Sequence, residues 1–167
     1  DYCLVPESGV KAFTDKLVAQ VKALKVGPGT TPGVNQGPLI DDKAVAKVEE
    51  HIADARAKGA RVLTGGEIED HGGQWLRPTV IVDVDHTMAL MVDETFGPVI
   101  PVMAYDSVEE AVALANEGLF GLSAAVVAGT LEEAEAIGRR IDAGGISLND
   151  GSLTANCHEA EKHSFKL

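Results

Sequence analysis

The stretch "VIPVMAYDSVEEAVALANEGLFGLSAAVVAG", residues 99–129, decides the fold class. It begins with an apolar run, 99–105, and ends with a second one, 121–129, and neither run alternates with polar residues. Between them Ser107 is followed three residues later by Glu110, which is the capping-box pattern at the start of a helix. Non-alternating strands separated by a helix are typical of a parallel sheet covered by helices on both faces. The stretch therefore predicts an α/β protein.

The same alternation of strands and helices extends over the rest of the chain. Further strands are predicted at residues 2–6, 60–66, 77–84 and 146–150. Further helices are predicted to start at Ser8, at Asp41 or Asp42 (ending near Lys58 and Gly59), and at Thr130 (over 130–145). We expect one domain over residues 1–167, with a layered, open, mainly parallel sheet and helices on both faces.

Composition excludes several classes of function. The net charge of -12 disfavours nucleic acid and anionic membrane surfaces, since binding to polyanions needs clustered Lys and Arg. No segment has the length and apolar character of a membrane span. Two cysteines, Cys3 and Cys157, make no disulfide framework, so a reducing compartment, the cytoplasm, is expected.

Several candidate sites have the wrong spacing. The glycines of the loop 26–39 match no phosphate-binding motif, and the helix after this loop begins with aspartates that would repel a phosphate. In "HEAEKH", residues 158–163, the histidines are five apart and would not share a helix face, so a metal site is not predicted even with Cys157 beside them. "GLSAA", residues 121–125, lacks the second glycine of a nucleophile elbow. Cys3 lies among apolar neighbours in a predicted strand and is expected to be inert.

Glu94 and Phe96, in "DETFGPVIPV" (residues 93–102), make the remaining candidate. A carboxylate can accept two hydrogen bonds from a ribose diol, and an aromatic face can pack on a flat nicotinamide. Gly97 and Pro98 would set the turn into the following strand. From the residues alone, a purely structural turn is the better interpretation, because a Glu and a Phe at this spacing are common.

Five segments together resemble the aldehyde dehydrogenase family, in its order and spacing. They are "QGPLIDDKAVAKVEEHIADARAKGARVLTGG", "LRPTVIVDV", "DETFGPVIPV", "EEAVALANEGLFGLSAAV" and "AGGISLND". Within the first, "GPLIDDKAVAKVEEHI" is similar to succinate-semialdehyde dehydrogenases. The resemblance implies a parent enzyme that oxidises an aldehyde, with succinate semialdehyde as the candidate substrate, to a carboxylic acid with NAD or NADP. It also implies a homo-oligomer.

The resemblance assigns roles residue by residue. Glu94 matches the family's carboxylate on the nicotinamide ribose, and Phe96 matches the aromatic residue that positions the ring. Asn149 falls near the family's asparagine beside the substrate tunnel, and a structural role for it is an equal alternative.

The nucleophilic cysteine and the base glutamate of the family match no residue here and are expected upstream of Asp1, as is most of the cofactor-binding domain. The family's C-terminal tail also has no match. The chain alone is then expected to be inactive. The competing hypothesis is a stand-alone, non-catalytic binding or interaction module derived from the same domain. The sequence identifies neither which aldehyde is oxidised nor whether NAD or NADP is the cofactor.

Overall fold

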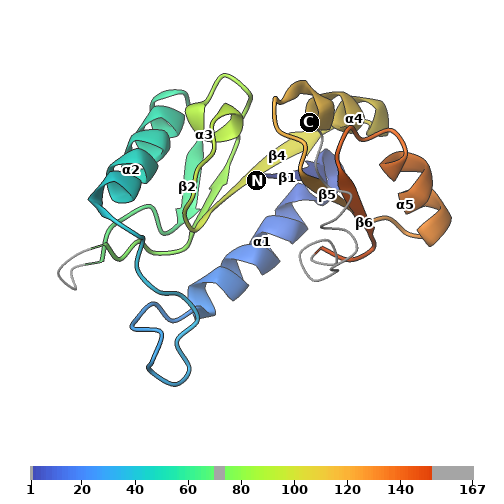
Figure 1. Cartoon of the computed structure of the whole chain (residues 1–167). Coiled ribbons are helices and arrows are strands. Elements are labelled where there is room, and N and C mark those ends of the chain that lie inside the picture. Colours follow the sequence, from blue (N-terminus) through green and yellow to red (C-terminus); the bar gives the residue numbers. More distant parts are fainter. Residues whose placement is uncertain (1, 70–73, 152–167) are drawn as a thin grey trace. The chain divides into compact units, whose positions relative to one another are not determined.

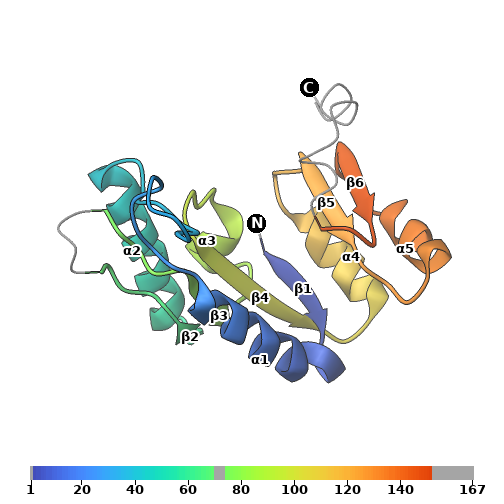
Figure 2. The ribbon, with the colours of Figure 1, turned by 90° about the horizontal axis from the view of Figure 1, so that it is seen from below.

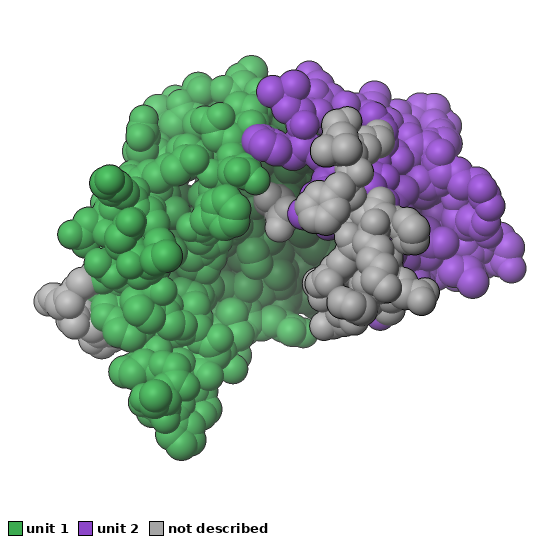
Figure 3. All heavy atoms as spheres, viewed as in Figure 1, with its two compact units in different colours: residues 1–105 green, residues 106–167 purple. Residues whose placement is uncertain are grey.

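The computed structural model describes residues 2–69 and 74–151 (Figure 1). Its elements, in chain order, are β1 (Cys3–Pro6), α1 (Glu7–Ala23), α2 (Asp42–Ala57), β2 (Arg61–Thr64), β3 (Thr79–Val82), α3 (Ala89–Val92), β4 (Val99–Tyr105), α4 (Val108–Glu117), β5 (Ser123–Val126), α5 (Leu131–Gly138) and β6 (Gly145–Leu148). They divide into two compact units, Asp1–Tyr105 and Asp106–Leu167, which Figure 3 shows in different colours.

The first unit contains a four-stranded sheet in the order β1-β4-β3-β2. Strand β4 is central and pairs in parallel with both β1 and β3, whereas β2 pairs antiparallel with β3 at the edge. Figure 2 shows this sheet with α1 running alongside it. The sheet is mainly parallel, as predicted, with one antiparallel edge strand.

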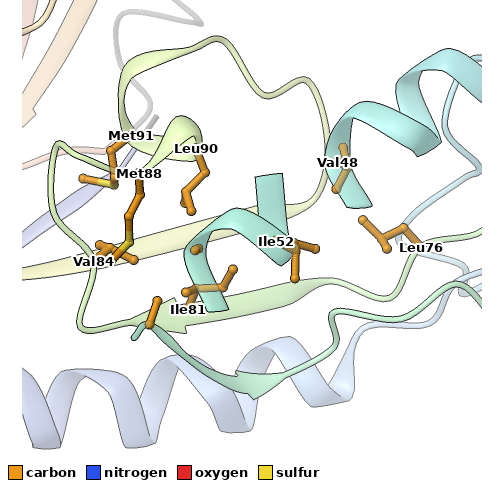
Figure 4. Packing of buried hydrophobic residues seen from close by; sticks show 10 residues of the cluster. Val48, Ile52, Leu76, Ile81, Val84, Met88, Leu90 and Met91 are labelled. Atoms are coloured by element: carbon orange, nitrogen blue, oxygen red, sulfur yellow. The ribbon is translucent and has the colours of Figure 1, made fainter. Parts of the chain in front are cut away.

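Side chains of β3 point alternately to the two faces of this sheet, and each face has its own core. Val80 and Val82 pack with the apolar residues of α1, and Ile81 packs on the opposite side with Val48 and Ile52 of α2. Figure 4 shows the second cluster, with α1 on the far side of the strand. Helices therefore cover both faces of the sheet, and the predicted fold class is confirmed.

Helix starts follow local capping chemistry at most positions. Asp41 caps α2 by accepting a hydrogen bond from the Ala44 amide at 2.8 Å, as expected for one of the two aspartates proposed. The predicted cap at Ser8 is wrong, because α1 begins at Glu7 directly after Pro6. Pro6 has a φ of -55°, which directs the chain from the strand into the helix without a side-chain cap.

The second unit contains the parallel pair β5-β6 with α5 packed against both strands. Thr130 and Glu133 form the reciprocal bonds of a capping box at α5. Ser107 accepts from the Glu110 amide at α4, but the Glu110 carboxylate accepts from the Asp106 amide, so the predicted box is only half formed.

Two sequence expectations fail in the second unit. The predicted buried strand at 121–129 is wrong in its burial, since Ser123 and Ala125 are exposed and β5 belongs to a sheet of only two described strands. Helix α5 ends at Gly138 rather than near residue 145. There a Cβ would lie 3.0 Å from the Leu148 side chain, so the helix packs closely on β6 just before it ends.

Candidate functional site

The segment 93–98 connects α3 to β4 and carries the two residues singled out from the sequence. Exposure alternates over residues 94–97 of this segment: Glu94 and Phe96 are exposed, and Thr95 and Gly97 are half-buried. Phe96 is 78% exposed, one of several large apolar side chains that are exposed among the described residues. The structure therefore places Glu94 and Phe96 on the solvent side of one short segment.

A histidine that the sequence analysis did not single out holds the inward side of this segment. His51 of α2 is 4% exposed, and its Nδ1 lies 2.6 Å from Thr95 Oγ1. Its Nε2 lies 4.0 Å from a carboxylate oxygen of Asp93. A carboxylate on that side favours a proton on Nε2, because an ionised carboxylate has no proton to donate. In that tautomer Nδ1 is the acceptor, and the Thr95 hydroxyl donates to it.

The end of the segment is fixed by close packing and by the sheet. A Cβ on residue 97 would lie 2.8 Å from Val48 Cγ2, so the glycine backbone fits directly against the buried face of α2. One residue on, the carbonyl of Pro98 accepts a hydrogen bond from the Thr79 amide at 2.8 Å. The segment thus enters β4 with its backbone held on two sides.

The start of the preceding helix, α3, is held by the same face of α2. Asp54 accepts a hydrogen bond from the Ala89 amide at 2.8 Å and pairs with Lys58, whose Nζ lies 2.6 Å from the Thr87 carbonyl oxygen. The Lys58 hydrogen bond and then the Ala89 amide hold the pKa of the Asp54 carboxyl below its usual range. Asp54 therefore acts as the N-terminal cap that α3 lacks in its own sequence.

These contacts form one continuous arrangement. Positions 58, 54, 51 and 48 of the α2 region follow one another at helical spacing, and they meet residues 87, 89, 95 and 97 in that order. The segment 87–97 therefore runs antiparallel to α2 along a single helical stripe. We call this set of contacts the α2 mount.

Asn149 stands in the second unit, just after β6. Its φ is 53°, in the left-handed region that Asn tolerates better than most residues. Its side-chain oxygen accepts from the Ala128 amide, and its own amide donates to the Val126 carbonyl, both at 2.8 Å. These bonds give Asn149 a structural role in joining β5 and β6, and leave its side-chain NH₂ group as the part available to a ligand.

The other sequence candidates lie as follows. Cys3 is half-buried in β1, and burial raises the pKa of its thiol, which favours the unreactive form. "HEAEKH" and Cys157 lie outside the described residues.

Within residues 2–69 and 74–151, no three His, Cys, Asp or Glu side chains lie close enough together to bind a metal ion. No helix in the same ranges is both long enough and apolar enough to span a bilayer.

One sequence signal could have indicated His51. It lies three residues after Val48 and one before Ile52, within the apolar stripe of a predicted amphipathic helix, where a lone histidine is expected to be buried with a polar partner. The partner is 44 residues away in the sequence, so the pattern could not identify it.

The exposed side of the segment offers a narrow set of chemical functions. The Glu94 carboxylate can accept hydrogen bonds from hydroxyl groups, and Phe96 offers an aromatic face at the same place. The one hydroxyl of this segment that lies beside a base, that of Thr95, faces inward to His51, so the exposed side carries no nucleophile paired with a base. The geometry suits holding a ligand better than transforming it.

Comparison with known proteins shows the family of the chain. Residues 1–163 match the sequence pattern of the Aldehyde dehydrogenase family. The glutarate-semialdehyde dehydrogenase of Pseudomonas aeruginosa is 43% identical over 143 residues, which are 86% of this chain and 30% of that protein. The succinate-semialdehyde dehydrogenase [NADP(+)] of Escherichia coli is 42% identical over 142 residues, 85% of this chain and 30% of that protein.

A solved structure is similar over almost the whole chain. The putative aldehyde dehydrogenase PutA from Anabaena variabilis superimposes with a TM-score of 0.89 and 44% identity, covering 94% of this chain and 34% of that one. The chain spans about a third of the length of these relatives.

Proposed function

The chain belongs to the aldehyde dehydrogenase family, and we propose that it is the catalytic domain of an enzyme that oxidises a semialdehyde to the corresponding acid with NAD or NADP. The family match over residues 1–163 carries this proposal. Two relatives named for glutarate semialdehyde and succinate semialdehyde support a short aldehyde that carries a carboxylate at its other end.

We assign Glu94 and Phe96 to the cofactor. When bound, the nicotinamide group accepts a hydride from the substrate. The side chains present fit such a group, because an exposed carboxylate stands beside an aromatic face that is 78% exposed. Glu94 would accept hydrogen bonds from the ribose hydroxyls, and Phe96 would limit the orientations of the flat ring. Both residues would thereby bind the cofactor and orient its nicotinamide ring. This raises the fraction of time that the ring spends in a geometry from which hydride transfer can occur.

No residue of this chain is assigned the role of nucleophile or base. Cys3 is not assigned as the nucleophile, because burial raises the pKa of its thiol and so disfavours the thiolate. Asn149 is assigned to the substrate side only through its side-chain NH₂ group, since its oxygen is engaged by Ala128.

Association into a homo-oligomer is a further part of the proposal. In the second unit several large apolar side chains are exposed: Leu119, Phe120, Leu122, Val127 and Leu131. Such surfaces are usually covered by other protein. Sedimentation of the enzyme at several concentrations tests this part, and a monomer at every concentration would contradict it.

The test of the main proposal is a substrate comparison. The enzyme that carries this chain is assayed for reduction of NAD and of NADP with succinate semialdehyde, glutarate semialdehyde and an uncharged aldehyde of similar length. We expect the highest kcat/KM for one of the two semialdehydes. A protein that reduces neither cofactor with any of the three aldehydes would favour the non-catalytic binding module instead.

A further inference from the structure

We propose that His51 is a positioning residue for the cofactor, acting through Thr95 on the segment that carries Glu94 and Phe96. This inference rests on the proposed function and deepens it. His51 itself is 4% exposed and therefore contacts no ligand. It acts on the ligand-facing side chains only through the inward side of the segment.

The geometry carries this role. Thr95 lies between Glu94 and Phe96 and points to the opposite side of the segment. Its hydroxyl is 2.6 Å from His51 Nδ1, a short contact at a half-buried position. Because Thr95 lies directly between Glu94 and Phe96, holding its side chain toward His51 restricts the directions that its two neighbours can take.

Within the α2 mount, Thr95 is the residue that controls the orientation of Glu94 and Phe96. Upstream, the Asp93 amide donates to the Ala89 carbonyl at 2.8 Å, which ties the start of the segment to α3. Downstream, Gly97 packs on Val48. Between these two anchors, the His51–Thr95 hydrogen bond is the side-chain contact that we propose holds Thr95 toward α2 and Glu94 and Phe96 away from it. Its loss would let Glu94 and Phe96 turn independently of α2.

We assign the ring proton of His51 to Nε2, because the Asp93 carboxylate lies on that side at 4.0 Å; with this assignment Nδ1 accepts and Thr95 donates. Substitutions can therefore be chosen that keep or remove the hydrogen-bond donor at residue 95 and the acceptor at residue 51. Thr95→Ser keeps the hydroxyl, and Thr95→Val keeps the shape without it. His51→Asn can place an amide oxygen where Nδ1 stands, and His51→Leu has no acceptor.

The first measurement needs no cofactor. Amide hydrogen exchange is followed in the 167-residue chain at Asp93 and Val99, whose amides donate to Ala89 and Gly97 on either side of Thr95. Removal of one hydrogen bond is expected to speed exchange at both sites roughly two- to twelvefold in Thr95→Val and His51→Leu. Thr95→Ser and His51→Asn are expected to stay close to the wild type. The amide of Arg140, in the second unit, serves as the internal reference.

The second measurement is the hydride-transfer step of the enzyme that carries this chain, observed in single turnovers. Thr95→Val is expected to slow this step and Thr95→Ser to leave it near normal, with Glu49→Gln on the exposed side of α2 as a control for unspecific effects. Because Thr95→Val changes a half-buried position, it remains informative even if His51→Leu fails to fold.

The outcomes separate the two proposals. Unchanged exchange in both Thr95→Val and His51→Leu would overturn the anchoring role. Faster exchange with an unchanged hydride step, while Glu94→Gln slows that step, would overturn the positioning role and leave the proposed function intact. A Glu94→Gln enzyme with a normal hydride step would overturn the assignment of this segment to the cofactor.

Discussion

Replacement of Gly97 by alanine tests the α2 mount by packing alone. The new Cβ would lie 2.8 Å from Val48 Cγ2 and 3.6 Å from Leu39 Cδ2. Carbon atoms attract each other best at about 3.5–4.0 Å, so the first contact is repulsive and the second is normal. The backbone of Gly97 is not in the left-handed region, so alanine meets no conformational strain there. Any loss of stability therefore reports the contact with α2.

The size of the effect follows from the freedom of Val48. This side chain is 1% exposed, and valine in a helix has one strongly preferred rotamer, so it cannot turn aside. Overpacking of this kind costs about 1–3 kcal/mol. A Gly to Ala change also reduces the backbone freedom of the unfolded chain, which raises the free energy of unfolding by about 0.4–1 kcal/mol. We expect Gly97→Ala to lower the free energy of unfolding by about 0–2.6 kcal/mol, the difference of these two effects, and by about 1–3 kcal/mol relative to a Gly→Ala change without the contact.

A second substitution makes the test specific. Val48→Ala alone removes two buried methyl groups and should cost about 2–3 kcal/mol, including the cavity that it leaves. In the double variant the methyl group introduced by Gly97→Ala occupies part of that cavity. The combined loss should therefore be smaller than the sum of the single losses by about 1–2 kcal/mol, in the range found for residues in contact.

The assay is urea unfolding followed by tryptophan fluorescence. Trp75 is the single tryptophan in the sequence and lies in the first unit, so its signal reports the unit that contains Gly97. Gly29→Ala is the matched control, because no atom lies within 4 Å of a Cβ at that position. Strictly additive losses, or a Gly97→Ala chain at least as stable as the control, would refute the close fit of the segment on α2.

Three further predictions follow from single side chains. Glu94→Gln should slow hydride transfer in the enzyme that carries this chain and leave the urea midpoint unchanged, since an exposed carboxylate contributes little to stability; a large fall in the midpoint would make Glu94 a structural residue. Asp54 has a lowered folded pKa, so the stability it gives is fully present above its unfolded value of about 3.9 and is lost as the pH falls through the lower folded value. Asp54→Asn, which still accepts from the Ala89 amide, should therefore lose less stability than the wild type between about pH 5 and pH 2, and equal acid sensitivity in urea titrations would contradict this. Cys3 should react slowly with an alkylating reagent until the pH exceeds the ordinary thiol range, because burial raises its pKa; rapid labelling near neutral pH would contradict this.

Local chemistry explains what the sequence could predict. The caps at Asp41 and Thr130 lie within three residues of the amides they bind, so the sequence alone contains both partners. The apolar run at β3 is buried at every position and that at β4 is buried at its centre, which fits their continuous hydrophobic pattern. Elements of this kind are specified by neighbouring residues.

Features set by distant residues could not be predicted. Helix α3 has four residues and no side-chain cap of its own, and it is stabilised from α2 by Asp54, 35 residues earlier. The antiparallel pairing of β2 with β3 depends on which edge of the sheet is free. The residues of β2 alone contain no signal for that edge. For the candidate site, the sequence indicated Glu94 and Phe96, but not the buried His51 that holds the residue between them.

The exposure of Phe96 is maintained by the backbone on either side of it. Full burial of a large apolar side chain stabilises a protein by about 1.5–3 kcal/mol, and Phe96, at 78% exposure, forgoes most of it. A loose turn could recover part of this energy by folding the ring onto nearby apolar surface. Here Thr95 is held by His51 and Gly97 lies against Val48, so the backbone cannot make that adjustment without breaking a buried contact. The α2 mount thus keeps an apolar ring in water at a cost in stability, as the proposed role of Phe96 in orienting a flat ligand requires.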